Sequence, residues 1–169
     1  MKTTSPRLAK PRVYIETSVI SYLTARPSRD ILILAHQQIT AEWWREDRLA
    51  FEIFTSAVVE TEAADGDPAA AKARLDALAD IPQLEVTPQA VALAKKLIVA
   101  LKLPQQAELD AYHIAVAAVH NIAFLLTWNC KHIANRHTLG ITRAVCLAAG
   151  HEAPDLCTPE TLLENPHEK

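Results

Sequence analysis

Glycine is scarce in this chain of 169 residues and occurs only at Gly66, Gly140 and Gly150. The dinucleotide-binding motif G-x-G-x-x-G and the P-loop motif G-x-x-x-x-G-K-[ST] both need closely spaced glycines, so neither can occur. The nucleophile motif G-x-S-x-G of many hydrolases is absent as well. These absences exclude the commonest glycine-rich phosphate-binding loops and the usual serine-hydrolase elbow.

Cysteine is also rare, and the three residues Cys130, Cys146 and Cys157 form no C-x-x-C pair. An odd number of cysteines without paired spacing is typical of reduced thiols in the cytoplasm. Cys130, His132 and His137 follow the pattern C-x-H-x₄-H, which lacks the paired spacing of zinc sites. We therefore expect a cytoplasmic protein without a structural zinc ion.

Long apolar runs and an excess of basic charge are missing too. No apolar run approaches the roughly 20 residues that span a bilayer, and none precedes Val13 as a signal peptide would require. We therefore expect no membrane association. The formal net charge is −3, so the chain as a whole does not attract a polyanion. A nucleic-acid partner would need a local basic patch or a bound cation.

Short apolar segments that alternate with helical patterns dominate what is present. Half of the residues are hydrophobic and 22% are charged, a balance typical of one soluble globular domain. The pattern predicts strands at 13–15, 50–55, 84–87 and 123–127, with helices between them. Strands separated by helices favour an α/β fold in which a parallel sheet carries helices on both sides.

Residues 12–150 form the predicted domain. A hydroxyl side chain, at Thr17 or Ser18, is expected to cap the helix that follows the first strand. Residues 1–11 are expected to form a flexible basic arm, and residues 151–169 an acidic C-terminal tail.

Polar side chains that could bind a metal ion are predicted at the carboxyl ends of the strands. Glu16 closes the first strand, Glu60 lies about one helical turn into the helix after the second, and Asp110 opens the helix before the fourth. Asn129 stands two residues beyond the end of the fourth strand. Ligands gather at this edge of open parallel sheets, and converging carboxylates favour Mg²⁺ or Mn²⁺, which prefer oxygen ligands. Such an ion can polarise a phosphodiester and activate water for hydrolysis.

Two neighbours of this predicted cluster have side chains that could contribute to it. His113 follows Asp110 on the same helical face, where a packed histidine is expected instead of a proton shuttle, because metal-assisted hydrolysis does not require one. The hydroxyl of Thr127 could help to position the cluster.

Four segments of the chain are similar, in order, to the successive motifs of one protein family. They are VYIETSVISYLTA (13–25), SAVVE (56–60), DAYHIAVA (110–117) and LLTWNCKHIAN (125–135). Together they resemble PIN-domain proteins over residues 12–150, and most closely the VapC-like toxins of type II toxin–antitoxin systems. The resemblance implies a three-layer α/β sandwich with a short, mostly parallel sheet. It also implies a Mg²⁺- or Mn²⁺-dependent endoribonuclease that leaves a 3′-hydroxyl and a 5′-phosphate.

Carried over position by position, the resemblance implies metal ligands at Glu16, Glu60 and Asp110. Asn129 falls where the family usually has a fourth acid, so it is implied as a catalytic residue that serves as an auxiliary ligand or orients its neighbours. The chain departs from the family twice, because Glu16 replaces a more usual aspartate and Asn129 brings no charge. We therefore expect one tightly held ion, with any second ion arriving alongside the substrate phosphate.

The resemblance also implies partners, namely an RNA substrate, a second copy in a homodimer, and a cognate antitoxin whose helix lies in an apolar groove near residues 20–45. Because the net charge is negative, phosphate contacts are expected from local basic residues. These are Lys2, Arg7, Lys10, Arg12, Lys131, Arg136 and Arg143. The neutral Asn129 leaves an alternative, a PIN-like module that binds RNA or protein without effective metal chemistry.

Overall fold

The computed structural model describes residues 9–164, which contain a sheet of five parallel strands. The strand order is β3-β2-β1-β4-β5, with β1 at the centre. The strands are β1 (Arg12–Ile15), β2 (Glu52–Ser56), β3 (Gln83–Leu84), β4 (Phe124–Leu126) and β5 (Asp155–Cys157). The predicted α/β class with a parallel sheet is therefore confirmed, and the four predicted strands correspond to β1 to β4.

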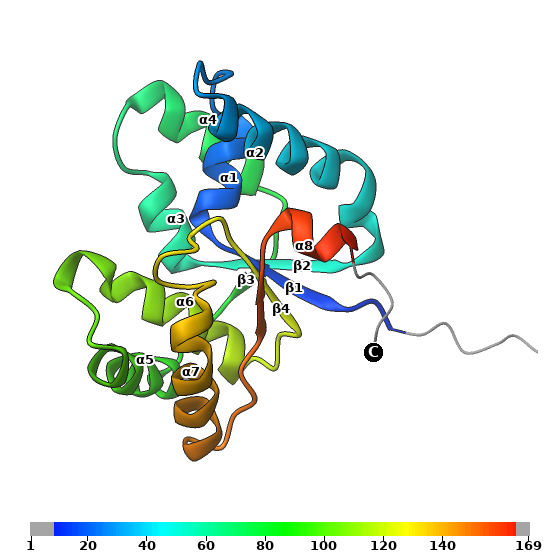
Figure 1. The fold of residues 1–169 in the computed structure, drawn as a ribbon. Helices are drawn as coiled ribbons and strands as arrows, with labels where there is room; N and C mark the ends of the chain where they lie inside the picture. The colour runs from blue at the N-terminus through cyan, green and yellow to red at the C-terminus, as the bar shows by residue number, and fades with distance from the viewer. Residues whose placement is uncertain (1–8, 165–169) are drawn as a thin grey trace, which may run out of the picture.

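Helices cover both faces of this sheet. They are α1 (Thr17–Thr24), α2 (Ile31–Glu42), α3 (Ala57–Ala63), α4 (Pro68–Leu78), α5 (Pro88–Leu101), α6 (Glu108–Val119), α7 (Arg136–Ala148) and α8 (Pro159–Glu164). In Figure 1, α5, α6 and α7 lie below the sheet, whereas α1, α2, α4 and α8 lie above it. This is the three-layer arrangement that the resemblance implied. No helix in the described part of the chain is long and apolar enough to cross a membrane.

The start of α1 differs from the sequence-based expectation. Its N-cap residue is Glu16, and Thr17 and Ser18 already lie inside the helix. Their hydroxyl groups donate hydrogen bonds to carboxylates, that of Thr17 to Glu62 and that of Ser18 to Glu16. Ser56 does cap its helix, because its side chain accepts a hydrogen bond from the backbone N–H of Val58. The two hydroxyl groups at the start of α1 therefore hold carboxylates at the carboxyl edge of the sheet instead of capping the helix.

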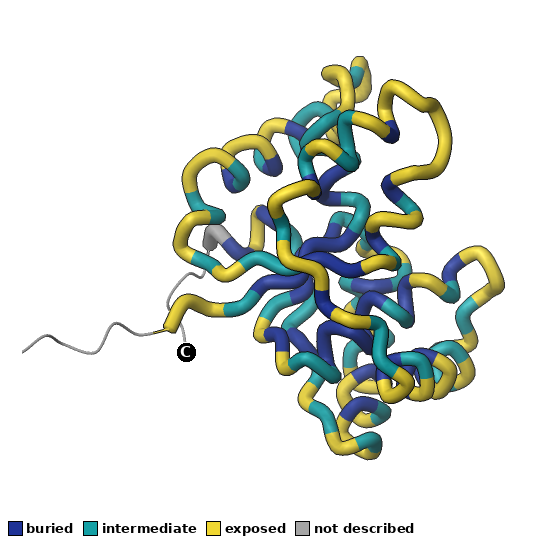
Figure 2. Tube along the Cα trace, turned by 180° about the vertical axis from the view of Figure 1, so that it is seen from behind, coloured by how far each residue is buried: buried dark blue, intermediate teal, exposed yellow. Residues whose placement is uncertain are grey.

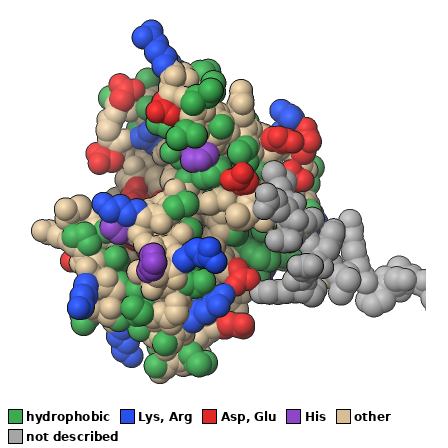
Figure 3. Space-filling view, in the orientation of Figure 1, with side chains coloured by type: hydrophobic (Ala, Val, Ile, Leu, Met, Phe, Trp, Pro, Cys, Tyr) green, Lys and Arg blue, Asp and Glu red, His purple; other side chains and the backbone are tan. Residues whose placement is uncertain are grey.

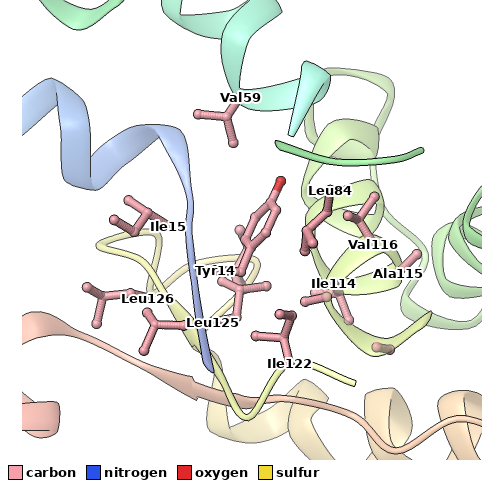
Figure 4. Close-up of a cluster of buried hydrophobic side chains, with 14 of the residues drawn as sticks. Tyr14, Ile15, Val59, Leu84, Ile114, Ala115, Val116, Ile122, Leu125 and Leu126 are labelled. Carbon is pink, nitrogen blue, oxygen red and sulfur yellow. The ribbon is translucent and has the colours of Figure 1, made fainter. Parts of the chain in front are cut away.

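The apolar core lies between the sheet and the helices. The side chains of β1 from Val13 to Ile15 have no exposed surface, nor have Leu125 and Leu126 of β4. Figure 2 shows the same concentration of burial in the middle of the molecule, and in Figure 4 side chains of β1, β4 and α6 meet in one cluster. Burial of apolar surface, at about 25 cal/mol per Å², is the main stabilising term of such a core.

The segment assigned to an acidic tail by its composition contributes structure where it is described. Residues Asp155–Cys157 pair with β4 as the fifth strand, and α8 packs against α2. Leu162 of α8 is only 5% exposed. The apolar side chains of this acidic segment therefore pack it against the domain. Residues 165–169 lie outside the described residues.

The basic arm is described only from residue 9 onwards, so Lys2 and Arg7 lie outside the described residues. Lys10 donates a hydrogen bond to the carbonyl oxygen of Leu49 at 2.6 Å. Arg12, in β1, donates one to the carbonyl oxygen of His120, also at 2.6 Å. Both basic groups are therefore engaged with the domain itself.

Removing the buried side chain of α8 tests whether this segment stabilises the domain. We expect Leu162→Ala to lower the free energy of unfolding by about 2–5 kcal/mol, because it leaves a cavity under α8. The matched control is Leu147→Ala in α7, where the side chain is 76% exposed and the change should stay within about 0.5 kcal/mol. Urea unfolding measures the free energy of unfolding of both variants. Equal values for Leu162→Ala and Leu147→Ala would contradict a structural role for α8.

Candidate active site

Glu16 occupies the carboxyl end of the central strand and is nearly buried. Its backbone N–H donates to the carbonyl oxygen of Leu126, which fixes its position beside β4. Its Oε2 accepts hydrogen bonds from the hydroxyl groups of Ser18 and Thr127, the latter at 2.7 Å. Its Oε1 accepts none from the described residues. One carboxylate oxygen is thus held by the protein and the other is left available.

Glu62, on α3, is held in the same way. Its Oε2 lies 2.8 Å from Nε2 of His113 and also accepts a hydrogen bond from the hydroxyl group of Thr17. No described residue donates to its Oε1. Burial raises the pKa of Glu62, but the hydrogen bond and charge of His113 and the hydrogen bond of Thr17 outweigh it, so the pKa is lowered. Glu62 is therefore a carboxylate at neutral pH.

Glu16, Glu62 and His113 form a group that could hold a metal ion, since one ligand atom from each lies within 4.8 Å of the others. Glu60 and Asp110, which the sequence analysis placed in the cluster, are not part of this group. Glu60 is exposed, and its Oε2 accepts a hydrogen bond from the side chain of Gln83 at 2.8 Å. The acid that α3 brings to the sheet edge is therefore Glu62.

Sequence reasoning missed Glu62 because helical periodicity does not distinguish it from Glu60. Residues two positions apart on an α-helix point in nearly opposite directions, so only one of the two can reach the edge. Val59 and Ala63 form the buried face of α3, and both glutamates flank that face. The distinguishing contacts come from Thr17 and His113, which are distant in sequence.

Asp110 lies in the first turn of α6, where the negative charge of Glu16 acts on it. Burial and the charge of Glu16 raise its pKa to about 6, although the charges of His113 and His132 and an interaction with Asn129 act in the opposite direction. Asp110 is therefore the carboxylate whose charge is least well compensated by the protein itself.

Asn129 interacts with Asp110 through its side chain and also restrains the loop after β4. Oδ1 accepts a hydrogen bond from the backbone N–H of His132 at 3.1 Å, which folds the loop after β4. The backbone N–H of Asn129 donates to the hydroxyl group of Thr127 at 2.8 Å. The side chain and backbone of Asn129 are thus both held within the loop after β4.

His113 is fully buried, as expected of a packed histidine, yet it contacts the site directly through Glu62. Burial alone would lower the pKa of its ring. The hydrogen bond to Glu62 and the charges of Glu16, Glu62 and Asp110 outweigh burial, so the pKa of His113 is raised. The ring therefore brings positive charge next to the carboxylates more readily than an isolated histidine would.

The raised pKa of Asp110 predicts that the free energy of unfolding of the metal-free protein depends on pH. Because the folded state binds this proton more tightly than the unfolded chain, the free energy of unfolding should fall as pH rises from about 4 to about 6. Asp110→Asn removes this loss of stability, so the variant should gain in melting temperature over wild type across that range, by about 2–4 °C for each kcal/mol relieved.

Thermal unfolding in a chelator at several pH values measures this difference. Asp76→Asn is the control, because Asp76 forms an exposed pair with Lys72 and such pairs contribute only about 0–1 kcal/mol. A difference between Asp110→Asn and wild type that stays constant from pH 4 to pH 7 would contradict the assignment of a destabilised carboxylate.

Comparison with known proteins supports the assignment of the fold. Residues 13–131 match the PIN domain family, and this stretch runs from β1 to the loop after β4, so it includes Glu16, Glu62, Asp110 and Asn129. No curated protein matches the chain. PIN domains are generally nucleases that use divalent metals, which is the chemistry that a carboxylate cluster at this edge suits. Because the match covers most of the chain, the protein belongs to the PIN-domain family.

Proposed function

We propose that the protein is a metal-dependent endoribonuclease that acts as the VapC-like toxin of a toxin–antitoxin pair. The observation that carries the proposal is the paired geometry of Glu16 and Glu62 beside Asp110. Each glutamate is held through Oε2 by two donors, and its Oε1 accepts no hydrogen bond from the described residues. This is a carboxylate site whose remaining oxygens suit a hard cation.

The donor set fits Mg²⁺ or Mn²⁺, and Glu16, Glu62 and Asp110 would hold the ion. When bound, the ion supplies Lewis-acid polarisation of the phosphodiester and lowers the pKa of water. Glu16 and Glu62 are preorganised by their hydroxyl and imidazole partners, so they need little reorganisation to bind. Asn129 orients Asp110 from the loop after β4.

Phosphate contacts are proposed for the basic residues close to the site. Lys131 and Arg136 are exposed in the loop after Asn129 and at the start of α7, and neither forms an ion pair with the described residues. Arg143 lies 3.4 Å from Asp155. In Figure 3, Lys, Arg and His side chains gather on the lower half of the face in view. Lys131 and Arg136 are the basic groups best placed to offset the negative net charge when RNA binds.

The toxin role is proposed from the family resemblance and from one surface. Ile31, Leu32 and Ile33 at the start of α2 are all exposed, the first of them by 79%. They fall within residues 20–45, where the antitoxin helix was expected, and exposed apolar groups of this kind suit a helix laid in a groove. A homodimer and a cytoplasmic location belong to the same proposal.

Asn129 favours a second candidate, a PIN-fold module that binds RNA or protein without cleaving it. The residue brings no charge to the site, and its carbonyl oxygen is used within the loop. Cleavage of single-stranded RNA by the purified protein in Mn²⁺, abolished by a chelator, would exclude this candidate. RNA binding without cleavage would support it.

The neighbouring glutamates of α3 provide a matched test of the site. We expect Glu62→Gln to reduce RNA cleavage by about 100-fold or more, since it removes a charge that the cation needs. Glu60→Gln changes the same helix by the same chemistry on its exposed side and should leave cleavage near the wild-type rate. Initial cleavage rates in Mn²⁺ are measured for wild type, Glu62→Gln and Glu60→Gln. A larger loss in Glu60→Gln than in Glu62→Gln would remove Glu62 from the site.

A further inference from the structure

A buried chain of hydrogen bonds runs from the end of β2 to the candidate active site. The hydroxyl oxygen of Tyr14 lies 2.7 Å from Oγ of Ser56 and 2.9 Å from Nδ1 of His113. Nε2 of His113 lies 2.8 Å from Oε2 of Glu62. Ser56, Tyr14 and His113 have no exposed surface. Four side chains from β2, β1, α6 and α3 are thus connected in one line.

The protonation states along this chain follow from its ends. Oε2 of Glu62 accepts from Thr17 and lies 2.8 Å from Nε2 of His113, so this contact is assigned as an N–H of His113 donating to Oε2. Burial raises the pKa of the Tyr14 hydroxyl, which therefore keeps its proton and can bond both Ser56 and Nδ1. Both nitrogens of the His113 ring are occupied in this arrangement. A nitrogen that donates to Glu62 has no lone pair to offer to a cation.

Tyr14 provides a rigid support for the imidazole. Its ring is packed in the apolar cluster of β1, β4 and α6, and in Figure 4 its hydroxyl points away from Ile122 and Leu125. The ring of Tyr14 also lies against that of His113, with centroids 5.8 Å apart. The position of His113 is therefore fixed by the core and not by the surface.

We propose that His113, supported by Tyr14, is a positioning residue that fixes Glu62 through Oε2 so that Oε1 faces the cation. The ring does not itself bind the metal. Glu16 gives the internal comparison, because two hydroxyl donors hold its Oε2 in the same manner. The inference rests on the proposed function and deepens it, since it assigns how one ligand of that site is held.

The affinity of the folded protein for Mn²⁺, measured by electron paramagnetic resonance of the free ion, tests this role without reference to cleavage. Loss of a hydrogen-bond partner behind a metal ligand typically costs about 10–100-fold in affinity, which is the loss expected for His113→Leu. His113→Gln places an amide N–H near the position of Nε2 and should stay within about threefold of wild type. Ile114→Val, a buried change on the same helix, should lower stability and leave Mn²⁺ affinity unchanged.

Three outcomes would overturn the proposal. Equal loss of Mn²⁺ affinity in His113→Gln and His113→Leu would mean that the ring itself binds the ion. Unchanged affinity in a folded His113→Leu protein would mean that Glu62 needs no such support. A wild-type protein that binds no Mn²⁺ would overturn the proposed function as well, whereas Mn²⁺ binding without RNA cleavage would overturn the proposed function alone.

A double-mutant cycle with Tyr14→Phe extends the test and covers the case in which His113→Leu does not fold. Phenylalanine preserves the ring in the core and removes only the hydroxyl group, so we expect a smaller loss of Mn²⁺ affinity than in His113→Leu. In the His113→Leu background, or in His113→Gln if the leucine variant does not fold, Tyr14→Phe should cause no further loss, because coupled residues are not additive. An equal loss in both backgrounds would contradict the chain from Tyr14 to Glu62.

Discussion

Repulsion between carboxylates at one edge of the sheet is the constraint on which the rest of this structure depends. Three acids brought together in partly buried surroundings favour their protonated forms unless donors or cations compensate them. Glu16 and Glu62 are compensated by donors from the protein, whereas Asp110 has its pKa raised to about 6. Asp110 is therefore the acid of this edge whose charged form is disfavoured by its surroundings.

The parallel sheet explains why the donors come from such different parts of the chain. The ends of β1 and β4, the starts of α1 and α6, and the last turn of α3 all contribute to the carboxyl edge. Each of these elements supplies either an acid or a group that restrains one. Two adjacent residues at the start of α1, Thr17 and Ser18, restrain two different glutamates through their hydroxyl groups.

Local pattern was enough to predict the strands at the centre of the sheet and the position of Glu16 at its edge, because apolar runs and their flanking charges are encoded in neighbouring residues. The choice between Glu60 and Glu62 could not be made in this way, since both flank the buried face of α3. β5 and α8 were hidden by the acidic composition of their segment.

Contacts between distant residues were beyond any local pattern. The hydrogen bond between Tyr14 and His113 joins residues 99 positions apart, and only the folded topology brings them together. The same applies to the hydrogen bond between Thr127 and Glu16, which are 111 positions apart.

The sequence separation within the site has a consequence for the time at which it forms during synthesis. Glu16 is made early, but its partner Thr127 follows 111 residues later, and β4 must then pair with β1. Parallel pairing across such separations is slow to form and requires both strands to be available. A growing chain on the ribosome therefore holds an incomplete carboxylate cluster until β4 and the loop after it have emerged. This edge of the sheet is therefore one of the last parts of the domain that can be completed during synthesis.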